Sequence, residues 1–259
     1  MMPDVLRAAE GEGILTLWLN RPEKRNALNA ALVVALAEAL EKAETRDDLR
    51  VIVLRGEGSD FCAGADLADL ERITDMGAEA SLADAQRLGD LFLQMRRHPR
   101  PIVAAVHGKA LAGGCGLATA CDLILASDAA KFGYPEVNLG FVPAMVMAIL
   151  RKKVTEGRAF ELVASGSLLS ASEAFRIGLV NRVFHAEDFE KAVDAFVKEL
   201  AQRPPKALAL TKSLLYELAD LSMEEGIRRG AEVNVEARQT DECREGVQTF
   251  LAKRKQVPE

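Results

Sequence analysis

Residues 101–122, Pro-Ile-Val-Ala-Ala-Val-His-Gly-Lys-Ala-Leu-Ala-Gly-Gly-Cys-Gly-Leu-Ala-Thr-Ala-Cys-Asp, decide how this chain folds. The apolar run over 101–106 predicts a buried strand, and the glycines that follow it predict a tight turn. The Ala- and Leu-rich continuation predicts a helix over 116–121, and the apolar run over 123–126 predicts another strand. Strands that alternate with helices in this way are typical of an α/β fold.

A second stretch upstream has the same design. The apolar run over 49–55 predicts a strand, and Gly56 and Gly58 separate it from a loop over 61–66, Phe-Cys-Ala-Gly-Ala-Asp. A helix that starts after such a loop has unpaired backbone N–H groups and a partial positive charge at its N-terminus. Two such loops facing each other would hold a carbonyl oxygen that becomes negative during a reaction. We therefore expect the loops at 61–66 and 113–116 to meet in one pocket.

Glu136 is the candidate acid/base residue for that pocket. It lies in Phe132-Gly133-Tyr134-Pro135-Glu136, at the start of an apolar stretch that continues to Val142. Burial raises the pKa of a carboxyl group, which can then carry a proton near neutral pH. Carboxylates are common on protein surfaces, so the residues alone leave open whether Glu136 carries a proton or is a solvated surface group.

The remaining patterns divide the chain into two parts. Residues 1–200 alternate between strand and helix patterns, with a further strand over 13–19, a helix over 28–43, and a helix that carries Leu88, Phe92 and Met95. Residues 73–81 have weak periodicity, and we expect them to be the most flexible segment. After Pro204-Pro205 only helical patterns occur. We therefore predict a helical C-terminal module over 201–259, whose apolar faces need the main domain or another subunit as partner.

Composition excludes several classes of function. The 259 residues are 49% hydrophobic and have a net charge of −6, and they contain no basic tract, so nucleic acid is not an expected partner. We expect no membrane span, no signal peptide and a cytoplasmic location. The four cysteines form no C-x-x-C pair, so reduced buried thiols are expected rather than disulfides or zinc. No metal site is predicted, because the histidines are isolated and are read as structural or surface residues.

The glycines of the second loop could instead belong to a dinucleotide-binding fingerprint. In a nucleotide-binding fingerprint a third small residue would close the pattern, but Gly114-x-Gly116-x-x-Thr119 has a threonine there. No phosphate-cradling G-x-x-x-x-G-K-[ST] sequence occurs either. Asp66 and Asp122 end loops beside predicted helix termini, where capping is the simplest role for them.

Five segments together resemble a known family. They are Asn20–Leu28 (N-R-P-E-K-R-N-A-L), Phe61–Leu67 (F-C-A-G-A-D-L), Pro101–Asp122, Phe132–Gly140 (F-G-Y-P-E-V-N-L-G) and Asp241–Arg254. In order and spacing they are similar to the enoyl-CoA hydratase/isomerase family, also called the crotonase superfamily, over nearly the whole chain. The resemblance implies a crotonase-like spiral of repeated ββα units and a C-terminal trimerisation module, assembled as a trimer or a dimer of trimers.

The resemblance also implies a substrate and a set of site residues. The substrate would be a coenzyme A thioester, with no separate cofactor, because coenzyme A is part of the substrate. The peptide N–H groups of Ala65 and Gly113 would form an oxyanion hole, and Glu136 would be the acid/base. Phe250 and Lys253, from this or a neighbouring subunit, would close over the nucleotide. The full set implied to bind substrate is Lys24, Arg25, Ala27, Ala63, Asp66, Leu67, Leu111, Gly114, Gly116, Leu139, Phe250 and Lys253.

One position departs from the family pattern. Standard hydratases of the family have a second glutamate where this chain has Gly116. Glu136 alone could activate water and then protonate the substrate, which is hydration, or pass a proton between two carbons, which is Δ3,Δ2-enoyl-CoA isomerisation. A non-catalytic acyl-CoA-binding protein is the alternative from another class. By analogy we favour hydration, and we expect residues 76–93 and 141–147 to line the acyl pocket.

Overall fold

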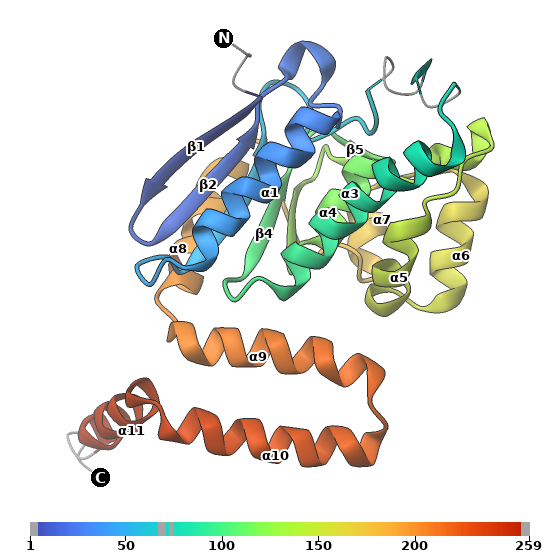
Figure 1. Cartoon of the computed structure of the whole chain (residues 1–259). Coiled ribbons are helices and arrows are strands. Elements are labelled where there is room, and N and C mark those ends of the chain that lie inside the picture. The colour runs from blue at the N-terminus through green and yellow to red at the C-terminus, as the bar shows by residue number, and fades with distance from the viewer. Residues whose placement is uncertain (1–4, 67–70, 73–74, 255–259) are drawn as a thin grey trace.

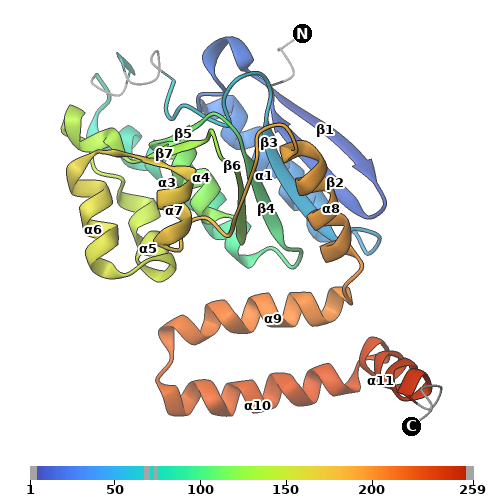
Figure 2. The same ribbon diagram turned by 180° about the vertical axis from the view of Figure 1, so that it is seen from behind.

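The computed structural model describes residues 5–66, 71–72 and 75–254, and its fold is mixed α/β, as the sequence predicts. Figures 1 and 2 show a layered body with a helical arm below it. A six-stranded sheet has the order β1-β2-β3-β4-β6-β9, and a three-stranded sheet has the order β5-β7-β8. The strands are β1 (Leu6–Gly11), β2 (Ile14–Leu19), β3 (Val51–Gly56), β4 (Ile102–Val106), β5 (Lys109–Leu111), β6 (Leu123–Ser127), β7 (Lys131–Gly133), β8 (Leu168–Ser170) and β9 (Arg182–Phe184).

The central strands of the larger sheet are buried on both faces. From β2 to β9 neighbouring strands are parallel, and only the β1–β2 pair is antiparallel. Successive side chains of a strand point to opposite faces. In β3, Val51 and Val53 therefore pack against α8 (Phe189–Ala201), whereas Ile52 and Leu54 face the main core. This two-sided burial explains why β3 is apolar throughout instead of alternating between apolar and polar residues.

On the other side of the large sheet lie α1 (Ala30–Glu44) and α3 (Ala78–Arg97), with α4 (Gly113–Ala120) beside them (Figure 1). Helices α5 (Ala144–Lys153), α6 (Glu156–Ser165) and α7 (Ala171–Arg176) lie farther to the side of the body (Figure 1). Helix α1 begins at Ala30, because the Asn29 side chain accepts a hydrogen bond from the Leu32 N–H as an N-cap. Its leucines Leu32, Leu36 and Leu40 are buried, as their spacing predicts.

Repetition of a strand–strand–helix unit relates the two sheets. β4 lies in the large sheet, β5 in the small sheet, and α4 follows; β6 and β7 repeat this order. Short bridges extend the small sheet toward earlier units, because Cys62 pairs with Ala110 and Leu28 pairs with Ala65. The chain therefore advances as a spiral, and the small-sheet strand of one turn lies beside the small-sheet strand of the next.

The flexibility expected for residues 73–81 stays a prediction: α3 begins at Ala78, and residues 73–74 lie outside the described residues. Two local predictions need correction. The second glycine turn is shorter than predicted, because α4 begins at Gly113 rather than at 116. Leu28 precedes α1 instead of starting it, because its backbone pairs with the loop at 64–66.

The C-terminal arm consists of α9 (Pro205–Glu217), α10 (Met223–Gln239) and α11 (Asp241–Arg254), and the helical patterns after Pro204-Pro205 predict helices close to these, over 207–218, 223–238 and 241–253. α9 and α10 run below the body as a hairpin, and α11 turns away from its end (Figures 1 and 2). Many apolar side chains of the arm are exposed in this single chain, including Leu215, Met223, Ile227 and Phe250. The boundary at residue 200 stays a prediction.

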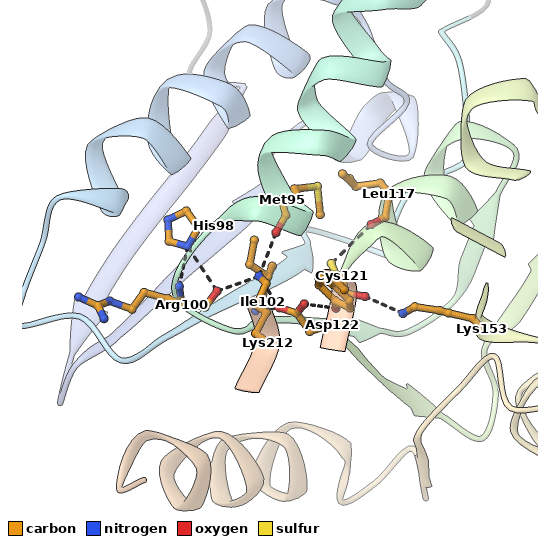
Figure 3. Close-up of polar contacts among 10 residues, drawn as sticks. Met95, His98, Arg100, Ile102, Leu117, Cys121, Asp122, Lys153 and Lys212 are labelled. Carbon is orange, nitrogen blue, oxygen red and sulfur yellow. Dashed lines mark hydrogen bonds and ion pairs between the residues drawn. The ribbon is translucent and has the colours of Figure 1, made fainter. Parts of the chain in front are cut away.

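A buried polar cluster fastens α9 to the body (Figure 3). The Lys212 ammonium lies 2.8 Å from Asp122 Oδ2, and the two side chains are only 8% and 12% exposed. It also donates to the carbonyl oxygens of Met95 and Arg100, at 3.0 and 3.1 Å. Tyr216 donates its hydroxyl hydrogen to Asp122 Oδ1. These additional hydrogen bonds compensate for the cost of removing the two charged groups from water.

Asp122 therefore has a different structural role from the predicted one. Its Oδ2 accepts a hydrogen bond from the Ile102 N–H at 2.6 Å, so it holds the start of β4 instead of capping a helix. The cysteines behave as predicted. Cys62, Cys115 and Cys121 are buried free thiols, and Cys243 on α11 is partly exposed.

Candidate active site

Ala65 lies where the first loop pairs with the segment before α1. The Leu28 N–H donates to the Gly64 carbonyl at 2.7 Å, and the Asp66 N–H donates to the Leu28 carbonyl at 3.0 Å. These two bonds flank Ala65 and leave its own N–H outside the ladder. Ala65 is exposed, whereas Gly64 and Asp66 on either side are buried. A backbone donor at this position is available to a ligand.

Gly113 is the first residue of α4, where backbone N–H groups have no partner within the helix. The first bond of the helix joins the Gly116 N–H to the Ala112 carbonyl at 2.9 Å. Ala112 itself has φ 48° and ψ −126°, a conformation that side chains disfavour. The Ala112 N–H donates to the Gly133 carbonyl at 2.9 Å, which helps to hold this strained turn. Such strain is common where a backbone is shaped for ligand binding.

The two loops contact each other, as predicted. Gly64 has φ +106°, and a Cβ there would lie 3.0 Å from Ala112 Cβ and 3.1 Å from the Leu111 carbonyl oxygen. A Cβ on Gly114 would overlap the Cys62 backbone and lie 2.6 Å from its Sγ. Only glycine fits at both positions, because the backbone of each loop occupies the space that a side chain would need.

Glu136 lies next to this junction, in the 3₁₀ turn η2 (Pro135–Leu139) directly after β7. β7 pairs with β5, which places Gly133 opposite Leu111 and brings η2 close to the start of α4. Oε2 of Glu136 is buried and has no hydrogen-bond partner in the part of the chain that the structure describes. Burial raises the pKa of this carboxyl group above its usual value, and no cation counteracts the shift. These properties suit a group that takes up and releases a proton.

A buried polar pair supports the strand before Glu136. The Tyr134 hydroxyl lies 2.7 Å from Thr119 Oγ1 on α4, and both side chains are fully buried. This bond ties β7 to α4, so the segments that carry Glu136 and Gly113 are fixed relative to each other. The sequence analysis did not identify Thr119 in this role, because its apolar neighbours suggested only a helix interior.

The predicted nucleotide-binding loop lies beside Ala65. The Ala63 N–H donates to the Arg25 carbonyl at 3.0 Å, so residues 25–28 run alongside residues 63–66. Lys24 and Arg25 are exposed, and Arg25 has a left-handed φ of 49°. Ala27 is buried. Two cationic side chains are therefore presented next to the candidate oxyanion hole.

Asn26 and Arg21 hold this loop, and neither was named as a site residue from the sequence. The fully buried Asn26 amide donates to the carbonyl oxygens of Glu57 and Asp60, at 2.8 and 2.7 Å. Arg21 binds the Asp66 carboxylate at 2.6 Å and also donates to the Ala27 carbonyl. The Asn-Arg-Pro and Asn-Ala-Leu elements in the sequence could have indicated this role, because buried polar residues are retained where they satisfy backbone groups.

The structure places three other predicted binding residues, and a fourth lies outside the described residues. The Asp66 carboxylate lies 2.6 Å from Arg21 Nη2, and its contact with substrate stays a prediction. Leu111 is half-buried beside the second loop, and Leu139 is 69% exposed at the end of η2. Leu67 lies outside the described residues.

Phe250 and Lys253 are not brought to the site by their own chain. Both are exposed on α11. In Figure 1, α11 lies at the bottom of the molecule and β5, beside the loops, lies near the top. The contribution of Phe250 and Lys253 to the site stays a prediction.

The Gly116 position is filled by neighbouring helices. A Cβ there would lie 3.2 Å from Phe92 Cζ on α3 and 3.5 Å from Val146 Cβ on α5. A side chain at this position would require the Phe92 ring to shift by a few tenths of an ångström.

A separate surface cleft lies between the β1–β2 hairpin and α8. Arg55, Asp194 and Lys198 line it, and no candidate site residue does. Among the described residues, no helix is both long and apolar enough to span a membrane.

Comparison with known proteins agrees with this geometry. The profile of the family described as enoyl-CoA hydratase/isomerase matches residues 9–258. The chain belongs to the enoyl-CoA hydratase/isomerase family. It is 42% identical over 241 residues to a putative enoyl-CoA hydratase of Thermus thermophilus, covering 93% of this chain and 95% of the relative. It is 34% identical over 242 residues to the 2,3-dehydroadipyl-CoA hydratase of Escherichia coli, covering 93% of each.

Solved structures of the enoyl-CoA hydratase/isomerase family share the fold. The crystal structure of an enoyl-CoA hydratase from Mycobacterium smegmatis matches with a TM-score of 0.92 at 32% identity and covers 98% of each chain. The crotonase fold implied by the sequence motifs is therefore confirmed.

Proposed function

We propose that this protein is an enoyl-CoA hydratase that adds water across the double bond of a 2-enoyl-CoA thioester. The observation that carries the proposal is the buried, unpartnered Oε2 of Glu136 next to two contacting loops with available backbone donors. Relatives at 34% to 42% identity that are named as hydratases support it.

The proposed mechanism uses backbone donors and one carboxylate. The N–H groups of Ala65 and Gly113 bind the thioester oxygen and stabilise its negative charge as the enolate forms. Ionised Glu136 removes a proton from water while the hydroxide oxygen bonds to the β-carbon. The electron pair of the double bond moves toward the thioester oxygen. Protonated Glu136 then delivers a proton to the α-carbon, which regenerates the carboxylate and yields the 3-hydroxyacyl thioester.

Coenzyme A would be held outside the reacting centre. Lys24 and Arg25 are exposed cations beside Ala65 and suit the phosphates. Phe250 and Lys253 would come from the neighbouring subunit of a trimer or of a dimer of trimers. The exposed apolar residues of the arm support such an assembly, because apolar patches of this kind mark interfaces.

Isomerisation is the second candidate. Gly116 supplies no second carboxylate at the start of α4, and one carboxylate is sufficient to remove a proton from the α-carbon of a 3-enoyl thioester and deliver it to the γ-carbon as the double bond moves. The names of the relatives favour hydration, and the glycine at position 116 keeps isomerisation as an alternative.

Assays of wild type and Glu136→Gln on crotonyl-CoA, 3-methylglutaconyl-CoA and a 3-enoyl-CoA test the proposal. We expect wild type to hydrate at least one of the 2-enoyl esters, and Glu136→Gln to lose at least about 100-fold, since proton transfer by a positioned side chain contributes about that factor or more. Glu187→Gln, at an exposed loop position, is the matched control and should leave the rate unchanged.

The possible outcomes separate the three candidates. Activity on the 3-enoyl ester alone, lost in Glu136→Gln, would establish the isomerase. Tight binding of acyl-CoA without turnover of any ester, unaffected by the substitution, would establish a binding protein and refute the proposed hydration.

A further inference from the structure

One face of α3 lies along the start of α4. A Cβ on Gly113 would lie 3.2 Å from Leu28 Cδ1 and 4.0 Å from Leu88 Cδ2, and a Cβ on Gly116 would lie 3.2 Å from Phe92 Cζ. Residues three or four apart in a helix share a face. Leu88 and Phe92 therefore form a stripe that follows Gly113 and Gly116 from the candidate oxyanion hole into the protein.

Helix α5 completes this wall. Val146 Cβ lies 3.5 Å from the Gly116 Cβ position, and Met145 Cγ lies 3.5 Å from that of Gly89 on α3. Phe92 is 3% exposed and Val146 is 4% exposed. The side of α4 that faces α3 and α5 is therefore bounded by hydrocarbon, and the Phe92 ring occupies the space beside Gly116.

We propose that Phe92 determines substrate specificity: its ring, packed on Gly116, closes the acyl pocket and restricts the acyl group to short chains. This inference rests on the part of the proposed function that places an acyl-CoA against Gly113 and Glu136. It requires acyl-CoA binding but not hydration. Phe92 acts here by shape, and it neither donates nor accepts a proton.

Binding measurements with saturated acyl-CoA esters test the inference without turnover. Titration calorimetry compares butyryl-, hexanoyl- and octanoyl-CoA on wild type, Phe92→Leu and Phe92→Ala. Wild type should bind butyryl-CoA at least as tightly as octanoyl-CoA. Each methylene that becomes buried in the vacated space contributes about fourfold in affinity, so the octanoyl-to-butyryl preference should rise at least tenfold in Phe92→Ala.

Phe92→Leu and two further variants serve as controls for this experiment. Phe92→Leu removes less volume and should fold even where Phe92→Ala does not; its octanoyl-to-butyryl preference should rise severalfold. Phe160→Ala truncates a phenylalanine that is 72% exposed on α6, and it should leave every ratio unchanged. Gly116→Ala adds a methyl group 3.2 Å from the ring and should lower the affinity for hexanoyl-CoA relative to butyryl-CoA.

The results distinguish this inference from the proposed function. Binding of acyl-CoA with unchanged chain-length preference in both Phe92 variants overturns the role of Phe92 and leaves the hydratase proposal intact. Shifted preferences in a protein that turns over no ester support the Phe92 role and refute hydration. Absence of any acyl-CoA binding overturns both.

Discussion

At the scale of single residues, the backbone donors and Glu136 differ in how they can be tested. Ala65 and Gly113 would act through main-chain N–H groups, so most side-chain substitutions leave the donor in place. Glu136 would act through its side chain, and its environment is apolar enough to alter its protonation. These differences lead to separate predictions.

Gly113→Pro removes the N–H donor, whereas Gly113→Ala keeps it. Loss of one oxyanion-hole donor costs about 3 kcal/mol of transition-state stabilisation, so kcat/KM of Gly113→Pro should fall at least about 100-fold. Gly113→Ala crowds only the flexible end of Leu28, at 3.2 Å, and should retain most of the activity. Steady-state kinetics with circular dichroism as a folding control check this. Near-normal turnover in Gly113→Pro would count against the oxyanion hole.

The raised pKa of Glu136 predicts how stability depends on pH. Because the folded-state pKa lies above the unfolded one, the native protein holds this proton more tightly. The free-energy cost of burying the ionised carboxylate is absent at pH values below the pKa of the unfolded state. It is complete at pH values above the pKa of the folded state. Glu136→Gln should therefore raise Tm at pH 8 and change it little at pH 4, as scanning calorimetry would show. An equal effect at both pH values would contradict the burial argument.

At the scale of elements, the sequence predicted most of the fold. Leucine spacing located α1, and the pattern after Pro204-Pro205 located all three helices of the arm. Strand β1 was missed, because its burial is slight and its sequence has no apolar alternation. The early start of α4 was missed because Gly113 and Gly114 suggest a turn, whereas contact with Cys62 is what requires glycine there.

Candidate site residues were recognisable in the sequence only where their role depends on neighbouring residues along the chain. Glu136 was recognisable from its apolar, Pro- and Gly-flanked context. The role of Asp122 was not, because Lys212, which lies far from it in sequence, decides where its carboxylate points. Phe92 looked like any buried helix residue, since its contact with Gly116 depends on how α3 and α4 pack.

The junction between α9 and the body depends on the Lys212–Asp122 pair. Removing one partner of a buried ion pair leaves an uncompensated charge and typically costs about 3–5 kcal/mol. Asp122→Asn and Lys212→Met should each lower the free energy of unfolding by an amount of that order, and the double variant should lose less than the sum. Urea denaturation of the four proteins provides the test. Strictly additive losses would show that the pair is not coupled.

At the scale of the whole molecule, the arm separates two parts of the predicted site. Glu136 lies in the body, and Phe250 and Lys253 lie on α11 at the far end of the same chain (Figure 1). If the arm of one subunit completes the site of the next, then two differently impaired chains should complement each other.

Mixing Glu136→Gln with the double variant Phe250→Ala/Lys253→Ala tests this. After unfolding and joint refolding at equal amounts, about one quarter of the sites should combine an intact Glu136 with an intact neighbouring arm. Activity of the mixture should exceed that of either variant refolded alone. Light scattering would verify the trimer or dimer of trimers. No gain in activity from an assembled mixture would argue that the arm does not act on a neighbour.

The distribution of thiols gives a practical means to observe such an assembly. Burial raises the pKa values of Cys62, Cys115 and Cys121 to about 12, 11 and 12, so these three thiols are protonated and shielded at neutral pH. Cys243 is partly exposed and lies on α11, seven positions before Phe250. A maleimide dye would therefore attach selectively to α11 of the native chain. Its fluorescence would report the docking of one arm on the next subunit without any engineered cysteine.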